Sequence, residues 1–134
     1  MLLKSYGWTI YVPSDFALAE NKPGENIICL KNSSGKDMVK WIFVYWIDNA
    51  SPSCLNEDSV RILRNKLANK YYNAPDVSSF VKIGKDNCIN DEITFDGRYS
   101  LVTQGLWENT KGMQGPFINY TFFDGNTKRL YMVD

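Results

Sequence analysis

The sequence contains no histidine among its 134 residues. Histidine is the usual proton shuttle near neutral pH, the usual base that activates serine or cysteine nucleophiles, and the commonest metal ligand. Its absence removes these three chemistries together. An enzyme built on this chain would have to work through carboxylates, lysine or tyrosine. The question of catalysis therefore stays open, a role other than catalysis is favoured, and a histidine-free hydrolase is the least favoured alternative.

Cysteine is scarce, with only Cys29, Cys54 and Cys88. None of them lies in a CxxC or another metal-binding spacing. An odd count does not resemble a disulfide framework, so three thiols are the simplest interpretation, and one bridge with one remaining thiol is the alternative. We predict no catalytic residue, no metal site and no cofactor.

Excess charge and long apolar runs are missing as well. Fifteen basic residues balance fifteen acidic ones, so the chain lacks the positive excess that neutralises phosphates, and we predict no nucleic-acid partner. No apolar run approaches the ~20 residues of a membrane span. Residues 1–4 are too few for a signal peptide. The residues themselves therefore indicate neither location nor oligomeric state.

Aromatic residues, in contrast, are abundant at 14%. They suit the surfaces of pleated sheets, and they also form contact faces for sugars or proteins. The length fits one domain over residues 1–134 and leaves little room for two.

Alternating side chains predict strands in the first third of the chain. The period of two typical of a half-buried strand covers Gly7–Val12, followed by a loop over Phe16–Gly24 and a short strand over Asn26–Lys31. The longest strand is predicted over Met38–Ile47. It is apolar on both faces in its second half, so we expect a central strand that is covered on both sides. A helix beyond Asp134 would cover the second face of this strand. One interpretation is therefore that the domain is truncated at its C-terminus.

One helix is clearly indicated after these strands. Asn56 is a good N-cap, and acidic residues follow it at the positive end of the helix dipole. An apolar stripe with spacings of 3, 4 and 4 predicts the buried face; it consists of Val60, Leu63, Leu67 and Tyr71. The basic and amide residues between them are expected mostly to face solvent; they are Arg61, Arg64, Asn65, Lys66, Asn69 and Lys70.

The last part of the chain reads as two hairpins. Residues 76–85 are ambiguous between a short strand and an irregular crossover. Glu92–Phe95 and Tyr99–Trp107 flank an Asp-Gly turn, and Phe117–Phe123 and Arg129–Val133 flank a second such turn. The predicted fold class is therefore α+β, an antiparallel sheet with one long helix inserted after the third strand, in the order βββ-α-ββββ.

Only one place stands out as a candidate binding site. Trp107, Met113 and Phe117 surround the loop Glu108–Gln114, where a small ligand or a partner protein could bind. Packing at the strand end is the alternative for Trp107. The acidic residues around the Asp96-Gly97 turn are explained by turn chemistry, which favours aspartate there, better than by catalysis.

Several blocks of sequence resemble a known family. The blocks are Asp91-Glu92-Ile93-Thr94-Phe95-Asp96-Gly97-Arg98-Tyr99, Gln104-Gly105-Leu106-Trp107, Gly115-Pro116-Phe117-Ile118-Asn119-Tyr120-Thr121 and Thr127-Lys128-Arg129-Leu130-Tyr131-Met132-Val133-Asp134. Together they resemble the family of domains of unknown function numbered 4837, predicted lipoproteins of Bacteroidetes. The likeness covers nearly the whole chain, as the C-terminal half of a longer protein.

This resemblance implies a cell-envelope location and membrane tethering through a lipid anchor that this chain does not contain. It also implies a further strand and a basic helix beyond Asp134. It carries no assigned activity and no catalytic residues. The strand–helix–strand order is also similar to the PsbP/Mog-type fold, whose members mostly act as binding or assembly factors. A protein-binding or assembly module is therefore the leading hypothesis, and a small-ligand or glycan-binding module is the alternative.

Overall fold

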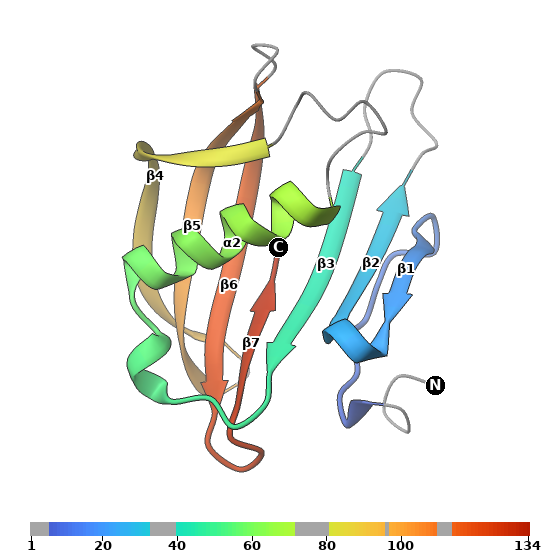
Figure 1. Ribbon diagram of the computed structural model, residues 1–134, viewed down its shortest axis with the longest axis vertical. Coiled ribbons are helices and arrows are strands. Elements are labelled where there is room, and N and C mark those ends of the chain that lie inside the picture. Colours follow the sequence, from blue (N-terminus) through green and yellow to red (C-terminus); the bar gives the residue numbers. More distant parts are fainter. Residues whose placement is uncertain (1–5, 33–39, 72–80, 96, 110–113) are drawn as a thin grey trace.

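The computed structural model describes residues 6–32, 40–71, 81–95, 97–109 and 114–134. Its elements are β1 (Ala17–Lys22), η1 (Pro23–Glu25), β2 (Ile27–Asn32), β3 (Lys40–Ile47), η2 (Pro52–Cys54), α2 (Glu57–Tyr71), β4 (Val81–Phe95), β5 (Arg98–Asn109), β6 (Gln114–Asp124) and β7 (Arg129–Val133). The strands form one antiparallel sheet in the order β1-β2-β3-β7-β6-β5-β4, and α2 lies across one of its faces (Figure 1). The predicted α+β class and the βββ-α-ββββ order are confirmed.

The predicted first strand over Gly7–Val12 is wrong. This segment belongs to no strand, although Trp8, Ile10 and Val12 are half-buried while the residues between them are exposed. The period of two therefore reflects an extended segment with one side turned towards the protein. Such a segment gives the same pattern of burial as a strand without pairing in the sheet.

The actual first strand, β1, lies inside the predicted loop over Phe16–Gly24. It pairs antiparallel with β2 and forms one edge of the sheet. Most of its side chains are exposed, so it lacks the apolar alternation by which strands are recognised. Strand β2 begins one residue later than predicted, because Asn26 has a left-handed backbone with φ of 56°.

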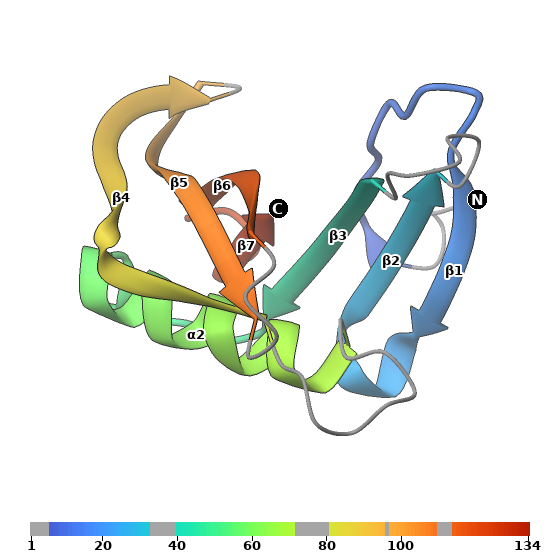
Figure 2. The ribbon, with the colours of Figure 1, turned by 90° about the horizontal axis from the view of Figure 1, so that it is seen from above.

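Four strand lengths also differ from the prediction. Strands β5 and β6 both extend into the predicted loop over Glu108–Gln114, and its two end residues pair with each other in the sheet. Strand β3 starts at Lys40, and the first two residues of the predicted strand lie outside the described residues. The longest described strand is β4, with 15 residues. It takes in the end of the ambiguous segment and is irregular between Ile83 and Cys88. There it bends, so that its first residues lie alongside α2 (Figures 1 and 2).

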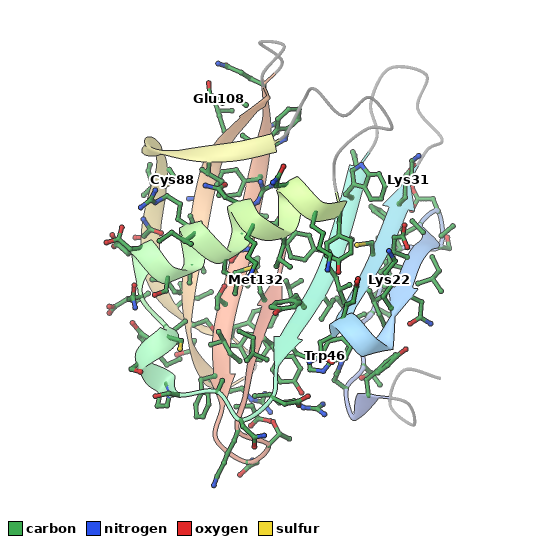
Figure 3. All side chains as sticks on the ribbon, in the orientation of Figure 1. Lys22, Lys31, Trp46, Cys88, Glu108 and Met132 are labelled. Atoms are coloured by element: carbon green, nitrogen blue, oxygen red, sulfur yellow. The ribbon has the colours of Figure 1, made fainter. Side chains whose placement is uncertain are left out.

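Helix α2 forms as its local signals predict. The Asn56 side chain accepts a hydrogen bond of 2.9 Å from the Ser59 amide, which is the expected N-cap contact. The predicted apolar stripe packs into the main core together with residues from four strands, β2, β3, β5 and β7. The buried core members are Ile27, Cys29, Phe43, Val60, Leu67, Leu101 and Met132; Met132 lies beneath the helix in Figure 3.

The opposite face of β3 is covered by the N-terminal segment. Trp46 is buried there, and the rings of Tyr6 and Trp8 pack on it with centroid distances of 5.1 and 5.6 Å. The guanidinium of Arg129 also donates a hydrogen bond to the carbonyl oxygen of Tyr6. Over this half of β3, the second cover that we expected from beyond Asp134 is thus supplied by Tyr6 and by Trp8, which lies in the wrongly predicted strand.

Candidate functional site

The structure places two of the three predicted binding residues on the helix-facing side of the sheet. Trp107 is paired with Gly115 and lies so close over it that a Cβ atom there would be 2.5 Å from the indole ring. Phe117 lies under the guanidinium of Arg64, 5.0 Å from ring centroid to Cζ. Met113 lies outside the described residues. A ligand site at these residues stays a prediction.

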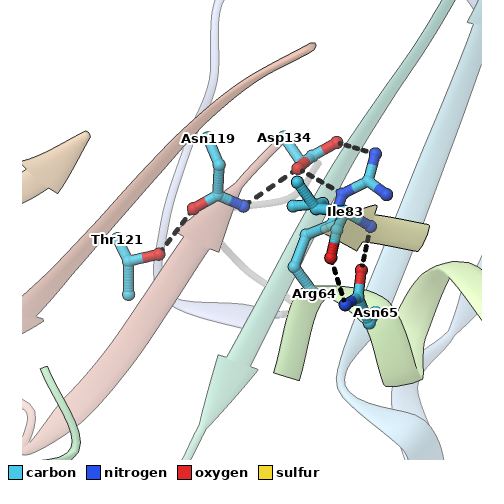
Figure 4. A network of polar contacts seen from close by, with 6 residues as sticks. All are labelled: Arg64, Asn65, Ile83, Asn119, Thr121 and Asp134. Carbon is cyan, nitrogen blue, oxygen red and sulfur yellow. Dashed lines mark hydrogen bonds and ion pairs between the residues drawn. The ribbon is translucent and has the colours of Figure 1, made fainter. Parts of the chain in front are cut away.

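Arg64 corrects the expectation of a solvent-facing basic flank on the helix. Its side chain is only 2% exposed, and it forms two hydrogen bonds, of 3.0 and 3.3 Å, with the carboxylate of Asp134 (Figure 4). The two residues are 70 positions apart in the sequence. Arg64 follows Val60 by four residues, so it points in the same direction as the apolar stripe. The burial of its charge depends on a distant carboxylate.

The same carboxylate continues into a buried chain of polar groups. Asn119 donates to Asp134 over 3.0 Å, and Thr121 donates to Asn119 over 2.7 Å. Beside this chain, the Asn65 side chain bonds both the amide and the carbonyl of Ile83, at 2.6 and 3.0 Å (Figure 4). These contacts fix the helix to β4, β6 and the residue after β7. Because these groups bond one another and connect separate elements, we assign them a structural role.

An apolar patch lies on the face of the sheet opposite α2. We use this name for Ile89, Ile93, Leu106 and Ile118. Their exposed fractions are 66%, 37%, 46% and 43%. Leu101 packs under α2, and its neighbours on β5 at even positions therefore point away from the helix. In the register, Gln104 of β5 lies between Ile89 of β4 and Ile118 of β6. Leu106 is two residues further along β5 and therefore on the same face as Gln104. Figure 2 shows α2 on the other side of the sheet.

A cavity of about 300 Å³ lies at the C-terminal end of α2. Lys66, Lys70 and Tyr71 enter it from the helix, and Glu25 enters it from η1. The Lys70 ammonium bonds the Glu25 carboxylate over 3.1 Å, and the Tyr71 hydroxyl donates to the same carboxylate. These hydrogen bonds, from Tyr71 first and then Lys70, lower the pKa of Glu25. At the base, burial raises the pKa of Tyr45.

A second, wider hollow of about 680 Å³ lies just beyond the C-terminal end of β3. Asp48 and Arg129 line it, as do Tyr6 and Thr127, and the Asp48 carboxylate forms an ion pair with the Arg129 guanidinium at 2.5 Å. Each of the two hollows has one carboxylate in its described lining, Asp48 here and Glu25 at the end of α2. A pair of converging carboxylates, which hydrolysis without histidine would require, is not found in either lining as described.

Another acidic residue, Asp124, serves a turn. Asp124 accepts hydrogen bonds from the Thr127 hydroxyl and the Asn126 amide, as expected for a hairpin turn. Within the described residues, no group of three or more acidic or cysteine side chains could hold a metal ion. The described helices also include none long and apolar enough to cross a membrane.

One family model matches the chain over residues 1–134. The chain belongs to the DUF4837 family. This family is described as a domain of unknown function, and the resemblance noted in the sequence is confirmed. A comparison with curated proteins finds no match. The family therefore assigns no role to the surfaces of this DUF4837 domain, and their chemistry has to be argued from the residues.

Sequence patterns did not point to either the patch or the cavity. Ile89 lies in a stretch to which no element was assigned, so its face was unknown. Lys66 and Lys70 were visible as an i, i+4 pair beside Tyr71, a spacing that puts them on one side of a helix. Glu25 lies between the predicted loop over Phe16–Gly24 and the strand predicted from Asn26, and the sequence gives neither of these a position relative to the helix.

Proposed function

We propose that this DUF4837 domain is a non-catalytic protein-binding or assembly module of the cell envelope, and that its partner docks on the apolar patch. The exposure of four large aliphatic side chains on one face of neighbouring strands is the observation that carries the proposal. Single exposed apolar residues are normal on protein surfaces, whereas adjacent ones mark interaction sites.

The patch also continues to β4, which is an edge strand of the sheet in the part of the chain that the structure describes. Strand β4 is the last strand on its side, and Ile89 and Ile93 both belong to it. A partner could therefore add an extended segment along β4 while its apolar side chains cover Leu106 and Ile118. We propose a partner with an uncharged, aliphatic contact surface. Such a partner avoids the cost of burying a charge against these side chains.

The envelope location is part of the same proposal. It rests on the likeness to predicted lipoproteins, which a lipid anchor tethers to the membrane. Extracts of a Bacteroidetes cell envelope are therefore the place to seek the partner.

Pull-down with a double variant tests the proposal. Leu106→Glu with Ile118→Glu places two charges in the patch, and we expect at least a roughly tenfold loss of the partner that the unchanged domain captures. Ile62→Glu is the matched control, because Ile62 is a large aliphatic residue that is 62% exposed on α2. Equal capture by the double variant and the unchanged domain would refute docking on the patch. Self-association that the double variant abolishes would show a second copy as the partner instead.

Small-ligand or glycan binding is a second candidate function. The cavity at the end of α2 favours it, because it combines apolar and charged groups in a concave space. The predicted site at Trp107 and Phe117 belongs to the glycan version of this hypothesis. A glycan array with Trp107→Ala would test that version, and the absence of any signal from the unchanged domain would count against it.

A further inference from the structure

The cavity at the end of α2 combines an apolar base with a cationic rim. Leu63, Leu67 and Tyr45 form the base, and all three belong to the main core or pack against it. Lys66 and Lys70 lie at the rim, one helical turn apart on α2. The end of α2 lies next to η1 (Figure 2). Gly24 and Glu25 of η1 also line the cavity.

The charges around the cavity are unequal. Glu25 is the only carboxylate in the described lining, and it is already held by Lys70 and Tyr71. Lys22 stands nearby, with its ammonium 5.5 Å from the centroid of the Tyr71 ring. Lys66 has no ion-pair partner among the residues that the structure describes. One ammonium at the rim is therefore available to an anion.

A second ammonium can be recruited without disturbing the core. The Lys70–Glu25 pair is exposed, with side-chain exposures of 57% and 38%. An exposed pair of this kind contributes little to stability, so Lys70 can turn towards a ligand at small cost. The Tyr71 hydroxyl is at the same place and can donate to an anion as it now donates to Glu25.

We propose that this cavity binds a small organic carboxylate with an apolar body. The carboxylate lies between Lys66 and Lys70, and the body lies against Leu63, Leu67 and Tyr45. The volume of about 300 Å³ is at the lower end of the range for ligand sites, which favours a short aliphatic or single-ring acid. The proposal gives the second candidate function a ligand class, and it does not depend on the apolar patch.

Titration with two simple probes, followed by amide NMR shifts, tests this site. Octanoate and benzoate should both shift the amides of residues 24–25 and 63–71 in a saturable way. Acetate carries the charge without the body, and 1-octanol carries the body without the charge. Each of these two should bind at least about fivefold more weakly than octanoate. Saturable shifts on β4–β6 alone, or equal binding of octanol and octanoate, would overturn the proposal.

Two single substitutions then locate the charge. Lys66→Gln should weaken octanoate binding roughly fivefold, the loss expected for one partly exposed ion pair. Lys40→Gln removes an equally ordinary exposed lysine on β3 and should leave binding unchanged. Both positions are on the surface, so both variants should fold. Unchanged octanoate binding by the Lys66→Gln variant would overturn the proposed site. Neither outcome bears on the separate proposal that a partner protein docks on the apolar patch.

Discussion

The Arg64–Asp134 ion pair is the most buried one among the described residues, with side-chain exposures of 2% and 6%. Taking two charges out of water is expensive, and their attraction offsets the cost only when further hydrogen bonds complete the geometry. Asn119 supplies one such bond to the carboxylate. The guanidinium also lies over the ring of Phe117. The pair therefore ties α2 to the middle of the sheet as one unit.

Removing one member of this pair should be much more harmful than removing an exposed one. Arg64→Met leaves the Asp134 carboxylate buried without its cation, and we expect a loss of roughly 3–5 kcal/mol in the free energy of unfolding. Arg61→Met is the matched control on the same helix, because Arg61 pairs with the exposed Asp58; it should cost less than about 1 kcal/mol. Urea denaturation measures both.

A double variant separates the pair from general packing. Adding Asp134→Leu to Arg64→Met removes the buried charge, and part of the lost stability should return. If Arg64→Met costs no more than Arg61→Met, the ion pair does not hold the helix to the sheet.

Thiol chemistry should follow burial at each cysteine. Cys29 is buried, which raises the pKa of its thiol to about 12, and Cys54 is exposed. Only the thiolate reacts with disulfide reagents. In a Cys88→Ser background at pH 8, Ellman's reagent should therefore label Cys54 quickly and Cys29 only as the protein unfolds. Fast labelling that persists after Cys54→Ser would contradict the burial of Cys29.

At the scale of elements, the N-terminal segment acts as a cover over one face of β3. Its residues Tyr6 and Trp8 pack on the face that α2 does not reach, and Tyr6 also donates a hydrogen bond to Asn21 on β1. The segment thus connects the edge of the sheet to its interior. It contributes to the core without contributing a strand.

Substitutions at Trp8 and Tyr11 test whether the N-terminal segment covers the sheet with one of its sides. Trp8 packs on Trp46, whereas Tyr11 is 95% exposed. Trp8→Ala should therefore lower the free energy of unfolding by about 2 kcal/mol, less than a fully buried tryptophan because its ring is half-buried. Tyr11→Ala should change it by less than about 0.5 kcal/mol. Equal losses in chemical denaturation would show that the segment does not lie on the sheet as described.

At the scale of the whole molecule, two carboxylates link stability to pH in the same direction. Burial acts to raise the pKa of Asp124, but hydrogen bonds from Thr127 and Asn126 and the charge of Arg98 outweigh it, so this pKa is lowered from 3.8. The pKa of Glu25 is lowered from 4.5. A lowered folded-state pKa stabilises the protein above the unfolded pKa, and this contribution disappears as the pH falls through the folded value.

We therefore expect the domain to lose stability as the pH falls below about 4.5. Asp124→Asn should be less stable than the unchanged domain at pH 7, and the two should converge as the pH approaches about 2, because the carboxylate is then protonated in both states of the unchanged domain. Thermal unfolding across this range measures the difference. If the difference in stability between Asp124→Asn and the unchanged domain stays the same at all pH values, the charge of Asp124 has no such role.

Local signals in the sequence determined much of this fold. The cap at Asn56, the apolar stripe that follows it and the Asp-Gly turn between β4 and β5 each depend on residues within one or two turns of chain. Such signals specify α2 and the hairpins before any distant contact forms. The α+β class and the place of the helix among the strands follow from such patterns, whereas the family was indicated by the resemblance of whole sequence blocks and is shown by the family model.

The tertiary structure decided what depends on distant partners. It placed β1, rather than Gly7–Val12, in the sheet, because an extended segment becomes a strand only when a neighbouring backbone pairs with it. It buried Arg64, because a carboxylate 70 residues away compensates its charge. It also gathered the apolar patch and the cavity at the end of α2 from separate elements. No local pattern carries that information, since these surfaces exist only once the sheet has its register and the helix its place upon it.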